Sequence, residues 1–114
     1  MSGDGKTTIA PEVLKSIARL SCLSVEGVSR MASSPVSIGR LLGKPIREGV
    51  EIEIEDDTVY LNLYVILKNN VNIREVSRNI QHKVYRAITD LVGMNVGKIN
   101  VHVEDIDYDT NSKE

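Results

Sequence analysis

The chain has 114 residues, of which 41% are apolar and 26% are charged, and its formal net charge is -2. This length fits one domain that can build its own core without disulfides or a structural metal. The charge excludes a globally basic nucleic-acid domain and a strongly acidic disordered chain. The single cysteine excludes an intrachain disulfide. The longest apolar stretch, Val59 to Leu67, is interrupted by Asn62 and is too short to span a membrane.

The first part of the chain predicts a strand, a helix and a second strand. Residues Lys6 to Ile9 are a candidate short strand. A helix is expected from about Pro11 to about Cys22, because proline suits a first helical turn and the apolar residues that follow are three and four positions apart. Val28 to Ala32 is expected to form a strand. Residues 33 to 49 are rich in Gly, Ser and Pro, which indicates a loop.

The strongest pattern in the chain is the alternation that begins at Val50. Apolar residues alternate with glutamates from Val50 to Glu55, and a second alternating run from Val59 to Leu67 follows the pair Asp56 and Asp57. Period-two patterning on both sides of a short acidic turn predicts a β-hairpin with one buried face.

A second helix and a last strand complete the domain. Asn72, with Glu75 three residues later, has the spacing of a helix N-cap, and apolar residues continue at helical spacing from Ile73 to Val92. Gly93 is expected to end this helix. The alternation of Ile99, Val101 and Val103 with polar residues predicts the last strand.

These elements predict an α+β domain over residues 6–107 with the order β-α-β-β-β-α-β. The strand that follows the second helix is expected to return parallel to the second strand of the hairpin, so the small β-sheet is mixed. Each helix has one apolar stripe, and both helices are therefore expected to pack on one face of the sheet. Residues 1–5 and 108–114 are expected to be disordered ends.

Three segments, in this order, resemble a known family. They are Ile9-Ala10-Pro11-Glu12-Val13 leading to Val25-Glu26-Gly27-Val28, Val59 to Val65 leading to Val76-Ser77-Arg78-Asn79-Ile80-Gln81, and Val96 to Val103. The chain resembles the alkaline shock protein family, the small envelope stress response proteins found mainly in Gram-positive bacteria. This resemblance covers residues 6 to 107. It implies a non-enzymatic binding or scaffolding role, since some members sit at the membrane through a small membrane-anchored partner.

The sequence predicts no catalytic, cofactor or metal site. Cys22 lies at the end of an apolar helical stripe and is expected to be a buried thiol. His82 and His102 are far apart and have no Cys or further His at metal-ligand spacing. The segment Gly39 to Lys44 lacks the glycine spacing and the Ser or Thr of a phosphate-binding loop. We therefore expect no enzyme and no cofactor.

Basic side chains form a candidate contact surface. Arg74, Arg78 and Arg86 recur, with His82, every four residues along the second helix, and residues 30–47 contain basic side chains and no acidic ones. The helical stripe is either a solvated face or a docking surface for an acidic partner, anionic lipid headgroups or nucleic acid.

Aromatic side chains form a second candidate surface. Tyr60 and Tyr64 share the outer face of the hairpin's second strand, and His102 is expected on the same face of the last strand. Exposed rings on an uncovered sheet face are typical of a reversible protein contact.

The leading interpretation is a cytoplasmic, non-catalytic scaffold that acts in envelope stress response or homeostasis. It is expected to bind a protein partner near the membrane through Tyr60, Tyr64 and His102, and to be capable of self-association. The alternative is a small nucleic-acid-binding module that uses Arg74, Arg78, Arg86 and the 30–47 loop. Salt-sensitive binding to RNA or DNA distinguishes this alternative.

Overall fold

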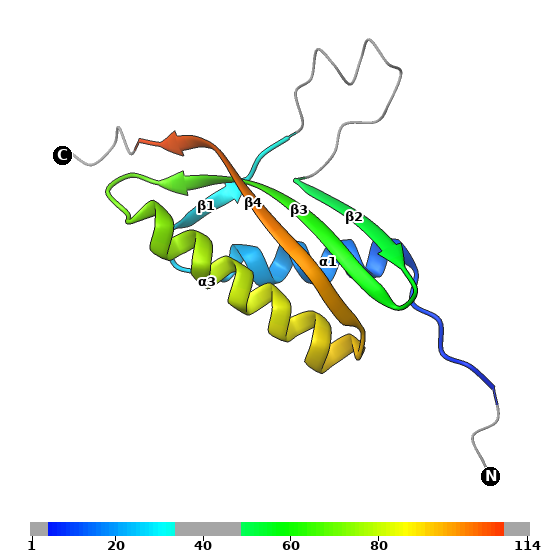
Figure 1. Ribbon diagram of the computed structural model, residues 1–114. Coiled ribbons are helices and arrows are strands. Elements are labelled where there is room, and N and C mark those ends of the chain that lie inside the picture. Colours follow the sequence, from blue (N-terminus) through cyan, green and yellow to red (C-terminus); the bar gives the residue numbers. More distant parts are fainter. Residues whose placement is uncertain (1–4, 34–48, 109–114) are drawn as a thin grey trace.

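A four-stranded sheet and two helices make up the computed structural model, which describes residues 5–33 and 49–108 (Figure 1). In chain order the elements are α1 (Pro11–Leu23), β1 (Val28–Met31), β2 (Val50–Glu55), β3 (Thr58–Lys68), α3 (Ile73–Arg86), the π-helical segment η1 (Ala87–Val92) and β4 (Asn95–Asp107). The α+β class is confirmed.

The long strand β3 is the centre of the sheet. β2 and β1 both run antiparallel to β3 on one of its edges, and β4 runs parallel to it on the other. The sheet is therefore mixed, as the sequence predicts. Between β1 and β2, the Ala32 N–H donates to the Tyr64 carbonyl and the Tyr64 N–H donates to the Gly49 carbonyl, both at 2.8 Å. These two strands thus lie end to end along one edge of β3.

The hairpin follows the predicted alternation. Asp56 and Asp57 form its two-residue turn with φ values of 49° and 65°. A turn with two positive φ angles matches the twist of the flanking strands, and Asp tolerates this conformation. The turn sets the pairing of Glu55 with Thr58 and places Ile52 opposite Leu61.

The second helix begins at its predicted cap. The Asn72 Oδ1 accepts a hydrogen bond from the Glu75 N–H at 2.9 Å. The sequence predicts an α-helix that continues to Val92, but the helix widens into η1 after Arg86. Its buried residues Val76, Ile80, Val84 and Ile88 are four positions apart, a spacing that drifts around an α-helix of about 3.6 residues per turn. The wider turns keep the fully buried Ile88 directed at the core.

One hydrophobic core joins the helices to the sheet. Leu14 and Ala18 of α1, Ile80 and Val84 of α3, and Leu63 of β3 are all 0% exposed and belong to one cluster. Both helices therefore cover the same face of the sheet, which confirms the predicted packing.

Two strand predictions need correction. Residues 6–9 have no regular secondary structure, so the predicted first strand is absent and the order begins with α1. Both edges of β3 are occupied by the other described strands, which leaves that segment without a neighbour on the central strand. The last strand is longer than its alternation predicts, since β4 extends to Asp107. The predicted disordered ends, apart from Gly5 and Tyr108, lie outside the described residues.

Candidate functional site

The face of the sheet opposite the helices carries a row of polar and aromatic side chains. Leu61 and Leu63 of β3 point into the core, so the intervening residues of that strand face the other way. The parallel register pairs Asn62 with Asn100 and Tyr64 with His102. We refer to Tyr60, Asn62, Tyr64, Asn100 and His102, together with Glu51 of β2, as the open face.

Tyr64 and His102 stack on each other at the centre of the open face. Their ring centroids are 4.7 Å apart and their planes are inclined by 14°. The Tyr64 hydroxyl donates to the Glu51 Oε1 at 2.8 Å. This arrangement links β2, β3 and β4 through side chains that are partly buried, and it fixes both rings.

Asn62 holds the other side of the His102 ring. The His102 Nε2 lies 3.0 Å from the Asn62 Oδ1, and the same oxygen accepts a hydrogen bond from the Asn100 Nδ2 at 3.1 Å. A carbonyl oxygen can only accept, so the His102 Nε2 carries a proton in this arrangement. His102 is therefore oriented by Asn62 and by the Tyr64 ring.

Tyr60 lies at the other end of the open face. It is four residues from Tyr64 along β3, which is about 13 Å in a strand. Gly97 is the extra residue of a bulge in β4, and a Cβ atom there would overlap the Tyr60 Cε2. The Tyr60 ring therefore rests on Gly97 and remains 37% exposed. The structure brings Tyr64 and His102 together but keeps Tyr60 apart from them.

Ile66, which the alternation also places on this face, is only 7% exposed. Across β3, Asp107 of β4 accepts hydrogen bonds from Ser29 at 2.7 Å and from the Arg30 Nε at 3.3 Å. Arg30 is paired with Ile66 in the sheet, so its side chain passes over β3 beside that residue. The hydrogen bonds from Ser29 and Arg30 hold the pKa of Asp107 below its ordinary value. Ile66 is therefore not an available contact residue.

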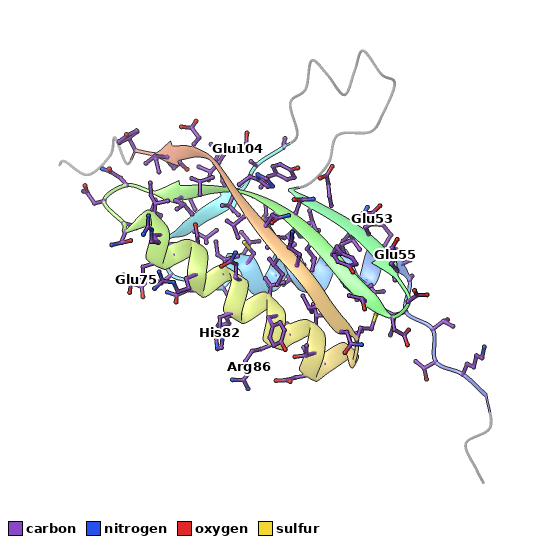
Figure 2. The ribbon with its side chains drawn as sticks, viewed as in Figure 1. Glu53, Glu55, Glu75, His82, Arg86 and Glu104 are labelled. Atoms are coloured by element: carbon purple, nitrogen blue, oxygen red, sulfur yellow. The ribbon has the colours of Figure 1, made fainter. Side chains whose placement is uncertain are left out.

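The predicted basic residues lie along the exposed side of α3. Arg74, Arg78 and Arg86 are all exposed, and Figure 2 shows His82 and Arg86 directed away from the sheet. The Arg86 Nε lies 3.3 Å from the Asp90 Oδ2, so this charge is partly compensated. Of the basic loop at 30–47, only Arg30 and its nearest neighbours belong to the described residues.

A shallow groove between α3 and β4 has no counterpart among the sequence predictions. Its volume is about 420 Å³, and it is lined by Arg78, Gln81, His82, Tyr85, Val96, Gly97, Lys98 and Ile99. The helical spacing of its four α3 residues signals a shared helix side. Only the tertiary packing shows which strand lies beside them.

Cys22 is the candidate nucleophile, and it is fully buried. Burial raises the pKa of its thiol to about 12. No group of three His, Cys, Asp or Glu residues within the described segments could hold a metal ion. None of the helices in those segments is long and apolar enough to cross a membrane.

We expect Cys22 to resist thiol reagents while the chain is folded. At pH 8 the native protein should show almost no reaction with Ellman's reagent, and the urea-unfolded chain should react fully. The thiol of the unfolded chain ionises near pH 9.0 and that of the folded chain near 12. Deprotonation therefore favours the unfolded chain, and stability should fall as the pH rises above 9. Rapid labelling of the native chain would contradict this burial.

The fold and the open face define a small α+β domain with helices on one side of its sheet and a hydrogen-bonded aromatic surface on the other. The model of the alkaline shock protein family, described as having a "cell envelope-related function", matches residues 1–108, and the chain belongs to this family. The match confirms the family resemblance seen in the sequence and gives the chain a cell envelope-related function.

Relatives with curated sequences match nearly the whole chain. Uncharacterized protein YqhY of Bacillus subtilis (strain 168) is 28% identical over 112 residues, which cover 96% of this chain and 83% of the relative. Uncharacterized protein Spy1535 of Streptococcus pyogenes serotype M6 is 33% identical over 106 residues, covering 90% of this chain and 79% of the relative. No solved structure gives a significant match.

Proposed function

We propose that this chain is a non-catalytic scaffold protein of the envelope stress response or envelope homeostasis, and that it binds a protein partner through the open face. The observation that carries this proposal is the Tyr64–His102 stack, with its hydrogen bonds to Glu51 and Asn62. Rings that are already fixed offer contact area with little further loss of conformational entropy on binding. The exposed Tyr60 and the glutamates of β2 would border this contact.

The positions of the chemically reactive groups support a binding role. The Cys22 thiol is buried in the core, and the His102 ring is engaged by Tyr64 and Asn62. Neither group is placed as a nucleophile and base pair, since Cys22 lies on α1 within the core and His102 on the opposite face of the sheet. In this proposal the protein is cytoplasmic, and its partner is a membrane-anchored protein that holds it near the envelope.

Paired tyrosine variants test the open face. The wild-type chain, the Tyr60→Ser with Tyr64→Ser double variant, and Tyr108→Ser as a control would each be immobilised and exposed to a membrane-containing lysate of the native cells. Tyr108 is 65% exposed and follows β4, so its loss removes an aromatic ring outside the open face. Proteins bound by the wild type should be retained by the control and lost by the double variant, as measured by quantitative mass spectrometry.

Two further measurements complete this experiment. Circular dichroism should show that all three chains are folded, and sedimentation should show whether the double variant also loses self-association. A Tyr64→Phe variant keeps the stack with His102 and removes only the hydroxyl that bonds to Glu51. Equal retention of the same proteins by the double variant and by Tyr108→Ser would place the contact elsewhere.

The nucleic-acid alternative stays a prediction. Its three arginines are exposed on α3, but Arg86 is paired with Asp90 and the net charge of the chain is -2. The oligonucleotide arm of the experiment in the next subsection tests it directly.

A further inference from the structure

The outer edge of β4 is available for pairing. β4 pairs with β3 and with no other strand among the described residues. The Gln81 Nε2 donates to the Ile99 carbonyl at 3.0 Å, so this carbonyl points away from β3 and toward α3. In a strand, every second residue directs its N–H and C=O to the same side. Val101 and Val103 therefore direct their backbone groups outward as well.

Two bulges define the regular part of this edge. Gly97 and Glu104 are each an extra residue relative to β3, and the stretch from Lys98 to Val103 between them pairs without interruption. Bulges commonly limit the pairing of exposed edges. Here they leave one short, regular segment that can accept another strand.

The groove beside this edge is basic. Its lining includes Arg78, His82 and Lys98 and contains no acidic residue, whereas Tyr85, Val96 and Ile99 provide apolar surface. The nearest acids on the same two elements lie at their other ends, where Figure 2 shows Glu75 at the start of α3 and Glu104 toward the end of β4. A ligand of complementary charge would therefore be acidic in this half of the groove.

We propose that the β4 edge and the α3–β4 groove bind an extended, acidic segment of a partner protein by strand addition. The outward N–H and C=O groups of β4 would pair with the backbone of that segment, and its acidic side chains would meet Arg78, His82 and Lys98. A peptide fits this edge better than a nucleic acid does, because the outward carbonyls of Ile99 and Val101 repel phosphate oxygens. The proposal concerns the edge of the sheet and is independent of the open face.

A defined peptide tests this proposal on the full chain. The probe is a fluorescein-labelled, capped peptide of about eight residues in which Glu and Val alternate, the length of an ordinary strand. Fluorescence anisotropy would measure its binding. A second peptide carries N-methyl groups on two adjacent central residues, so that neither of its edges can pair. We expect binding of the first peptide and at least a tenfold weaker binding of the second.

Charge reversals locate the site. Arg78→Glu with Lys98→Glu should weaken binding of the Glu–Val peptide by about tenfold or more, because both residues line the groove. Arg74→Glu with Lys83→Glu is the matched control, since it makes the same change in net charge at exposed α3 positions outside the groove. This control should change the affinity by no more than about twofold.

Three results would overturn the proposal. The N-methylated peptide could bind as well as the unmodified one, or the control pair could weaken binding as much as the groove pair. An RNA oligonucleotide could bind more tightly than the peptide, with a steep salt dependence and loss through Arg78→Glu, which would favour the nucleic-acid alternative. Failure of the Tyr60 and Tyr64 variants to affect partner capture would leave the edge proposal untouched, so the two ideas fail separately.

Discussion

Replacing Leu63 with alanine is expected to lower the free energy of unfolding by about 2–5 kcal/mol. Leu63 is 0% exposed at the middle of β3, and its strand neighbours are Val50 on β2 and Val101 on β4. The variant would leave a cavity beneath both helices that the close-packed core can fill only in part. Urea unfolding followed by circular dichroism would measure the loss.

Leu91→Ala is the matched control for this prediction. Leu91 lies on η1 and is 76% exposed, so the same change should alter the free energy of unfolding by less than about 0.5 kcal/mol. A nearly neutral Leu63→Ala would mean that the hairpin register is displaced by one residue, because such a shift exchanges the two faces of the strand.

Gly49→Ala is expected to be the second strongly destabilising change. Gly49 has a φ of +79°, and a Cβ atom there would lie 2.9 Å from the Tyr64 carbonyl oxygen and 3.0 Å from that of Ala32. The left-handed backbone alone costs a non-glycine residue about 1–2 kcal/mol. Both oxygens belong to the backbone of the sheet and cannot move aside easily, so the total should exceed about 2 kcal/mol.

Gly93→Ala separates these two contributions. Gly93 has a nearly identical φ of +80°, but nothing lies within 4 Å of the Cβ position. It should show only the cost of the backbone conformation, in the same unfolding experiment. Equal losses at the two glycines would show that the close approach at Gly49 carries no energetic weight.

Local patterns predicted the elements that depend on near neighbours in the sequence. The alternation around Asp56 and Asp57 predicts the hairpin, and Asn72 is the N-cap that its spacing to Glu75 indicates. The strand at Lys6 to Ile9 was wrong because a short run of strand-compatible residues forms a strand only when a sheet edge is available to pair with it.

Contacts between distant segments account for the rest. Alternation places Tyr64 and His102 on one face, but their stacking depends on the parallel register of β3 and β4, which no local pattern specifies. Likewise, no sequence signal places Gln81 against the Ile99 carbonyl. The groove beside that contact arises from the way α3 packs along β4, and sequence periodicity identifies only the helix side that lines it.

The junction at Tyr64 bears on how this fold tolerates changes in length. In an unbroken antiparallel strand, one residue would supply both the acceptor and the donor opposite Tyr64; here Gly49 supplies the acceptor and Ala32 supplies the donor. The two ends of residues 33–48 are thus held next to each other by a single residue of β3. Because the entropy of closing a loop rises only slowly with its length, by about 0.6 kcal/mol per doubling, a longer or shorter insert would leave the sheet intact. This edge of β3 is therefore a natural place for the domain to acquire or lose a whole module.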